Sequence, residues 1–396
     1  MRPTSVLATI TGRDRSGVTA AFFAALAAHD VDVRDVEQVV IRDRLILTVL
    51  FDLRGDTAAL RNSVTRTASA LGMECEIAVA DQGDSARPDL PGTRHHVIVL
   101  GHPLRPGAVS HVAQCIADMG GNIETVTQLS TEPASALEML VRTHDPVGLR
   151  AVLVQAADDT GVDIAVEPAG LRRRAKRLVV LDVDSTLIRD EAIDVLAAHA
   201  GVAEEVAAIT ARAMAGELDF ARSLHERVAL LAGLPETVVD QVRAALTLTP
   251  GARTFVRTLR RLGYYVGVVS GGFTTFTDRF VAELGLDFAA ANELEIVDGA
   301  VTGRVLGRVV DRAGKADALR RFADEFGVPL SQTVAVGDGA NDIDMLEAAG
   351  LGVAFNAKSA LRAAADTSVN LPYLDTVLFV LGISGADVAE AAADVR

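Results

Sequence analysis

The stretch LVVLDVDST, from Leu178 to Thr186, is an apolar run that ends in two aspartates, followed by two hydroxyl residues. A continuous apolar run of this length predicts a buried strand of a parallel sheet. Asp182 and Asp184 would then lie at the carboxyl end of that strand, where two carboxylates repel unless a cation or a proton lies between them. On its own, this pair fits a catalytic site and a simple turn equally well.

Three further runs, YVGVVS, TVAVGD and LGVAF, have the same character and carry Gly or Asp near their carboxyl ends. Helical patterns fit the segments between them, namely Pro250 to Leu262, Phe273 to Leu284 and Lys315 to Phe326. This alternation predicts an α/β domain with a Rossmann-like parallel sheet and its chemistry at the carboxyl edge. Residues 190–247 follow the first strand as a helical insertion, a candidate cap, and Asp298–Gly299 predicts a hairpin turn.

The segment VVSGGF provides a candidate phosphate site. Ser270 ends a strand, and Gly271 and Gly272 leave backbone N–H groups free at the start of a helix. Such N–H groups, the helix dipole and a hydroxyl together hold phosphate. Lys315 opens a later helix and would supply a positive charge, although a lone lysine at that position is usually exposed.

The segment VAVGDGANDIDML ends another strand in Asp338, with Asp342 four positions later. Carboxylates from two strand ends suit a hard cation such as Mg²⁺. Alone, this segment could equally be a calcium-type turn or a helix N-cap.

The order of these features resembles the haloacid dehalogenase superfamily of phosphatases, over roughly Arg177 to Leu381. The resemblance implies that Asp182 is the nucleophile that forms an aspartyl-phosphate. It also implies that Asp184 protonates the leaving alkoxide and then deprotonates the hydrolytic water. The form DxDST is typical of phosphotransferases, because the dehalogenases lack the second aspartate.

The same resemblance implies a metal site and a phosphoryl site. Mg²⁺ would be held by the Asp182 carboxylate, the Asp184 backbone carbonyl and Asp338, with Asp342 ordering bound water. The sequence does not separate Mg²⁺ from Mn²⁺. The charge on the transferring phosphoryl group would be neutralised by Ser270, Gly271 and Lys315.

Within that superfamily, the segment DVDSTLIRDE and the cap segment MAGELDFARSLHERV look like those of the phosphoserine phosphatases. This resemblance implies that Glu191 binds the substrate ammonium and Arg227 its carboxylate. Met214 and Phe220 would pack over the serine carbon and exclude water, and Asn341 would contact the substrate near the metal. The implied reaction is hydrolysis of O-phospho-L-serine, the last step of serine biosynthesis. Outside this context, Glu191 and Arg227 would be taken for surface charges.

The N-terminal part repeats the order strand, helix, strand, strand, helix, strand twice, which predicts two α+β ferredoxin-like (βαββαβ) domains. We place them at residues 1–82 and 93–168, and the phosphatase domain at residues 175–396. Hydrophilic stretches from Asp81 to Arg94 and from Glu167 to Arg177 separate the domains. The run Arg172–Arg173–Arg174 in the second stretch is expected to be solvated.

The two repeats resemble ACT domains, which sense small molecules in amino-acid enzymes. In ACT domains, the turn between the first strand and the first helix, here called the effector turn, holds an amino-acid effector. The positions that match this turn are Asp14, Gly17 and Gly107, and we expect a positive φ at both glycines. The resemblance implies an amino-acid effector, serine above all, and by analogy a homodimer or higher homo-oligomer. The second repeat lacks a counterpart of Asp14.

Composition excludes several partners. A net charge of −15 at pH 7 disfavours nucleic acid and acidic membrane surfaces. The chain has two cysteines, Cys75 and Cys115, which suit neither a disulfide framework nor a metal site. The absence of a signal-peptide pattern and of a membrane-length apolar run predicts a soluble cytoplasmic protein.

The sequence leaves two alternatives open. The same aspartyl-phosphate could pass its phosphoryl group to another hydroxyl acceptor instead of water. The chain could also be an amino-acid-binding regulator with an inert phosphatase fold, although the intact Asp182, Asp184, Lys315 and Asp338 argue against this.

Overall fold

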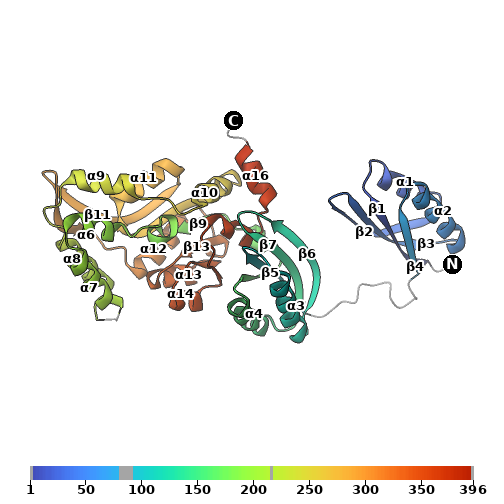
Figure 1. The fold of residues 1–396 in the computed structure, drawn as a ribbon, viewed down its shortest axis with the longest axis horizontal. Helices are drawn as coiled ribbons and strands as arrows, with labels where there is room; N and C mark the ends of the chain where they lie inside the picture. The colour runs from blue at the N-terminus through green and yellow to red at the C-terminus, as the bar shows by residue number, and fades with distance from the viewer. Residues whose placement is uncertain (1–2, 80–91, 215–216, 394–396) are drawn as a thin grey trace. The chain divides into compact units, whose positions relative to one another are not determined.

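The computed structural model describes residues 3–79, 92–214 and 217–393 (Figure 1). The chain forms two compact units that divide between Leu90 and Pro91. Within the described residues, no helix is both long enough and apolar enough to cross a membrane.

The first unit is a βαββαβ domain, as predicted. Its elements are β1 (Thr4–Arg13), α1 (Val18–Ala27), β2 (Val31–Ile41), β3 (Arg44–Leu53), α2 (Thr57–Ala70) and β4 (Glu74–Val79). The strands form an antiparallel sheet in the order β2-β3-β1-β4. Alternate residues of β1, such as Val6, Ala8 and Ile10, are buried against Phe22 of α1 and its neighbours, which is the period expected of a sheet with one covered face.

The second unit begins with another domain of this type. Its elements are β5 (Thr93–Gly101), α3 (Pro106–Asp118), β6 (Asn122–Ser130), β7 (Ser135–Thr143), α4 (Pro146–Thr160) and β8 (Asp163–Pro168). The sheet order, β6-β7-β5-β8, corresponds to that of the first domain.

The two effector-turn glycines differ in conformation. Gly17, which precedes α1, has a φ of 92°, as expected. The expectation was wrong for Gly107, which is not among the glycines with positive φ. It lies in the first turn of α3 directly after Pro106, and the fixed φ of a proline at the first position favours the start of a helix there.

The rest of the second unit is the predicted α/β domain. Its sheet has the order β12-β11-β10-β9-β13-β14-β15. The strands are β9 (Leu178–Leu181), β10 (Tyr265–Phe273), β11 (Phe288–Val297), β12 (Ala300–Leu306), β13 (Thr333–Gly337), β14 (Gly352–Phe355) and β15 (Thr367–Val369). All neighbours in this order run parallel except β12, which pairs antiparallel with β11 through the predicted Asp298–Gly299 hairpin.

Helices cover both faces of this sheet. They are α10 (Ala252–Arg261), α11 (Thr274–Leu284), α12 (Arg312–Glu325), α13 (Ile343–Ala348), α14 (Ser359–Ala364), α15 (Val377–Val380) and α16 (Gly385–Ala393). Val179 and Leu181 of β9 belong to the core that includes α10 and α11, whereas Leu178 and Val180 belong to the core that includes α12 and α13. The continuous apolar run of β9 is therefore explained by burial on both faces.

The cap follows β9 and its loop as predicted. It contains α6 (Ala192–Ala200), α7 (Ala203–Met214), α8 (Phe220–Ala229) and α9 (Glu236–Ala245). The segments that enter and leave the cap pair with each other. Ile188 forms a β-bridge with Leu248, and the Arg189 N–H donates to the Thr247 carbonyl at 3.0 Å. The cap is thus inserted through one paired connection next to the loop that carries Asp182.

The second ACT-like domain is hydrogen-bonded to the α/β domain. Asp163, at the start of β8, accepts from the Asn370 N–H and side-chain amide, both at 2.8 Å, and from the Leu371 N–H at 3.2 Å. Arg173 lies between the domains as well. It pairs with Glu138 of β7 and donates to the Val380 carbonyl at 3.2 Å. The expectation of a solvated arginine run was therefore wrong for Arg173, which is buried.

Glu167, near the end of β8, is a buried carboxyl group with a testable pH effect. Burial raises its pKa from 4.5 to about 7, opposed by Lys176 and reinforced by Asp366. The folded state therefore binds a proton between these pH values that the unfolded state has lost, so ionisation of Glu167 destabilises the fold as the pH rises through this window. In Glu167→Gln this group cannot ionise.

We expect Glu167→Gln to melt at the same temperature as wild type near pH 4.5. Above pH 7 it should gain about 2–3 kcal/mol over wild type, a rise of several degrees. Scanning calorimetry of both proteins across this pH range measures the difference in melting temperature. The contributions of the other titrating groups cancel in this difference. A difference that does not change with pH would contradict the raised pKa.

Candidate active site

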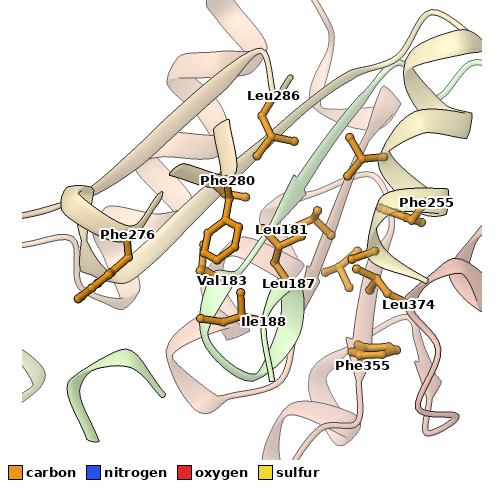
Figure 2. Packing of buried hydrophobic residues seen from close by; sticks show 14 of the residues in the cluster. Leu181, Val183, Leu187, Ile188, Phe255, Phe276, Phe280, Leu286, Phe355 and Leu374 are labelled. Atoms are coloured by element: carbon orange, nitrogen blue, oxygen red, sulfur yellow. The ribbon is translucent and has the colours of Figure 1, made fainter. Parts of the chain in front are cut away.

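The site lies at the carboxyl edge of the sheet, where β9 is flanked by β10 and β13. Leu181 pairs with Val268 on one side and with Val336 on the other, so the residues after each strand end emerge at the same level. The floor below them is apolar. Figure 2 shows Leu181, Val183 and neighbouring residues packed around Phe280 of α11. A rigid floor of this kind fixes the loop that carries Asp182.

Lys315 lies in the centre of the site. Its Nζ is 2.7 Å from Asp182 Oδ1 and 2.7 Å from Asp342 Oδ1, and all three side chains are buried. Burial alone would lower the pKa of Lys315, but the two carboxylates outweigh burial and raise it. Lys315 is therefore a fixed cation and not the exposed residue that a lone lysine usually is.

Asp182, Asp338 and Asp342 form a carboxylate cluster. One oxygen from each lies within 4.8 Å of the others. Burial and the charge of Asp342 raise the pKa of Asp182 well above its usual range, and the same two causes raise the pKa of Asp338 to about 6. The single positive charge of Lys315 does not balance these groups. Clustered oxygen donors with excess negative charge fit a hard divalent cation.

Asp342 reaches this cluster because of the glycines around it. Gly339 donates its N–H to Asp342 Oδ2 at 3.1 Å, and a Cβ on Gly337 would overlap the Asp342 carboxylate. Any larger residue at Gly337 would push Asp342 away from Lys315. Asn341 lies beside this turn, with its Oδ1 against the Gly339 backbone.

Asp184 is positioned by the cap and by the turn from Ser270 to Gly272, here called the phosphate turn. Its Oδ1 accepts from the Ala192 N–H at 2.9 Å, and its Oδ2 accepts from Ser270 Oγ at 3.2 Å. Ser270 Oγ in turn accepts from the Gly272 N–H at 2.8 Å. Burial raises the pKa of Asp184, which favours the protonated form that a general acid needs.

The cap brings two opposite charges towards this edge. Ser185 has a φ of 57° and donates its hydroxyl to Glu191 Oε1 at 2.9 Å. Glu191 keeps surface exposure, yet the surrounding protein displaces enough water to raise its pKa to about 7, with Asp184 adding to the shift. Burial lowers the pKa of Arg227, against the opposing charges of Asp194, Glu191 and Asp184. Arg227 and Glu191 thus lie within electrostatic range of each other and of Asp184.

Of the two apolar cap residues predicted to cover the substrate, the structure describes the side chain of Phe220. Phe220 begins α8, and its ring lies against the phosphate turn, since a Cβ on Gly271 would be 2.8 Å from Phe220 Cζ. Met214 ends α7, and its side chain lies outside the described residues.

One site residue was missed by the sequence analysis. Asn292 of β11 is buried and hydrogen-bonded to the Gly271 carbonyl. Asparagine is depleted in strands, so its presence between AAA and LEIV was a signal that could have been followed.

Family comparisons agree with this architecture. Residues 179–347 match the haloacid dehalogenase-like hydrolases, and residues 4–78 and 93–167 each match an ACT domain. The chain is thus a haloacid dehalogenase-like hydrolase that carries two ACT domains.

Comparisons with individual proteins identify a narrower family within these hydrolases. A phosphoserine phosphatase of Streptomyces coelicolor is 57% identical over 98% of this chain and 94% of its own length. One of Mycobacterium tuberculosis is 54% identical over 98% of this chain and 95% of its own. A solved structure described as a phospho-aspartyl intermediate analogue of phosphoserine phosphatase is 45% identical, with a TM-score of 0.50 over 52% of this chain and 98% of that one. The chain belongs to the phosphoserine phosphatase family.

Proposed function

We propose that this protein hydrolyses O-phospho-L-serine to serine and phosphate through an aspartyl-phosphate on Asp182. The observation that carries the proposal is a nucleophile clamped by Lys315 at a sheet edge that also faces a carboxylate and a guanidinium from the cap. The names of the relatives and the solved phospho-aspartyl analogue support it.

In the first step, a carboxylate oxygen of Asp182 attacks phosphorus and the bond from phosphorus to the serine oxygen breaks. Asp184 gives its proton to the departing alkoxide, so serine leaves as the alcohol. In the second step, Asp184 takes a proton from water, which attacks the aspartyl-phosphate and releases phosphate. Lys315 and Ser270 would hold the phosphoryl oxygens throughout both steps.

The carboxylate cluster supports a role for Mg²⁺, held by Asp182, the Asp184 carbonyl and Asp338, with Asp342 nearby. When bound, the cation would neutralise phosphoryl charge and so allow the anionic Asp182 carboxylate to approach the anionic phosphate group.

The cap would select the substrate. Glu191 would bind the ammonium of phosphoserine and Arg227 its carboxylate, while Phe220 covers the space above Gly271. These two charges distinguish phosphoserine from sugar phosphates, which carry neither an ammonium nor a carboxylate.

Arg227→Ala should raise the KM for phosphoserine by about 10–100-fold, because the carboxylate loses a charged partner in a partly buried place. The kcat/KM for phosphoethanolamine, which lacks a carboxylate, should change less than about threefold. Steady-state kinetics with both substrates give the ratio, and Arg222→Ala, an exposed arginine on the same helix, is the matched control. Equal losses on both substrates would make Arg227 structural.

We further propose that serine binds the ACT domains and regulates the enzyme. Asp14 and Gly17 lie in the exposed turn before α1, in which Gly17 is left-handed. Gly107 occupies the corresponding place in the second domain but within a helix. Isothermal titration of serine into wild type and Asp14→Ala tests this.

The direct test of the proposed function is phosphate release from phosphoserine by the full-length protein with Mg²⁺, compared with sugar phosphates. We expect phosphoserine to be preferred and activity to vanish with EDTA. Preference for sugar phosphates would overturn the substrate, and a phosphorylated acceptor in place of free phosphate would indicate transfer.

A further inference from the structure

Asn292 is a buried polar side chain inside the catalytic sheet, with 1% of its surface exposed. It lies in β11 beside β10. Burying an amide is costly unless the amide is hydrogen-bonded, so its partners show what it does for the fold.

Its two hydrogen bonds join two segments of the site. Asn292 Nδ2 donates to the Gly271 carbonyl at 2.8 Å, and Asn292 Oδ1 accepts from the Val310 N–H at 2.7 Å. Gly271 belongs to the phosphate turn. Val310 precedes α12, the helix that carries Lys315.

The bond to Gly271 falls where the sheet ladder is irregular. β10 and β11 pair regularly as far as Val269 and Ala290, and the register shifts before Phe273 meets Asn292. Gly271 lies within this shifted stretch. The Asn292 amide therefore supplies a bond to its carbonyl where the regular ladder is interrupted.

The bond to Val310 fixes the start of α12. The next residue, Asp311, is the N-cap: its Oδ1 accepts from the Gly314 N–H at 2.8 Å and its carbonyl accepts from the Lys315 N–H at 2.8 Å. A shift of Val310 would move this cap, and with it the Lys315 ammonium that lies 2.7 Å from Asp182.

We propose that Asn292 is a positioning residue for phosphoryl transfer. It holds the phosphate turn and the start of α12 at the separation that lets Ser270, Gly271 and Lys315 contact one phosphoryl group. This role rests on the proposed phosphatase function but not on the identity of the substrate, because Asn292 acts on the phosphoryl site and not on the cap.

Two variants test the role. Asn292→Leu removes both bonds at similar size. Asn292→Asp keeps the acceptor for Val310 but places an oxygen against the Gly271 carbonyl. In both, kcat should fall by about 10–100-fold, the loss expected of a displacement of order 1 Å, and inhibition by orthovanadate, which resembles the transferring phosphoryl group, should weaken similarly. The KM for phosphoserine should change less than about threefold, because Glu191 and Arg227 are untouched.

Thr333→Val is the matched control. Thr333 is fully buried at the amino end of β13, and its hydroxyl donates to the Leu330 carbonyl at 2.8 Å and accepts from the Gly350 N–H at 3.3 Å. This variant also loses two buried hydrogen bonds, but far from the phosphate turn. It should lower the melting temperature and leave kcat and vanadate inhibition unchanged.

The proposal is overturned if the Asn292 variants behave like Thr333→Val, with lower stability but wild-type kcat and vanadate inhibition. If Asn292→Leu does not fold, the isosteric Asn292→Asp decides by the same criteria. If wild type does not hydrolyse phosphoserine, the proposed substrate fails separately, and p-nitrophenyl phosphate serves as substrate for the same comparison.

Discussion

Replacing Asp182 with asparagine should lower turnover of phosphoserine by roughly 10⁴–10⁶-fold, the loss typical of removing a nucleophile. The amide has nearly the same shape but cannot form the acyl-phosphate. The fold should be unharmed, because burial and repulsion from Asp342 already raise the pKa of Asp182, so a neutral side chain suits this position. Turnover of the variant, measured with Mg²⁺, and its melting temperature, measured without added metal, check both statements.

A matched change at the other end of the sheet controls for the substitution itself. Asp287 accepts from the Val266 N–H at 2.8 Å, near the amino end of β10. Asp287→Asn should keep wild-type turnover. Near-normal activity of Asp182→Asn would show that another residue is the nucleophile.

Replacing Lys315 with methionine should have the largest effect on stability. The change removes the cation between Asp182 and Asp342 and leaves buried carboxylates without a partner. Breaking a buried ion pair from one side costs about 3–5 kcal/mol, or roughly 10 °C in melting temperature for a domain of this size. Turnover should fall by roughly 10²–10³-fold or more, because the phosphoryl charge loses a fixed partner.

Lys358 provides the control for Lys315. It is exposed beside the same site, and its charge only partly opposes the rise in the pKa of Asp338 that burial and Asp342 cause. Lys358→Met should change stability by less than about 0.5 kcal/mol. Melting curves of the two variants without metal compare them directly, and equal effects would mean that net charge, rather than the buried bonds of Lys315, stabilises the site.

The elements and the catalytic edge could be predicted because their signals are local. Each parallel strand is buried on both faces and so appears as an apolar run, and Asp182, Ser270 and Asp338 directly follow such runs. Parallel strands bring their carboxyl ends together whatever lies between them in sequence. Glu191 and Arg227 came from family resemblance, since a single helical charge has no pattern of its own.

What could not be predicted depends on distant partners. Asn292 bonds to residues 21 and 18 positions away, and Arg173 pairs with Glu138 and bonds to Val380, 35 and 207 positions away. An asparagine within a strand is unusual, but local composition does not reveal its partners, and the arginine run gave no sign that Arg173 would be buried. Gly107 was assigned by its place in the repeat, while the proline before it had already set a helical turn.

The central step of the proposed reaction is phosphoryl transfer from phosphoserine to Asp182. Wild-type protein mixed with phosphoserine and Mg²⁺ and quenched in acid should carry a phosphoryl group on the peptide that contains Asp182, detected by mass spectrometry. The adduct should be absent from Asp182→Asn and should disappear from wild type as phosphoserine is exhausted and phosphate accumulates. Phosphate release without an adduct on this peptide, or an adduct on another residue, would contradict the account.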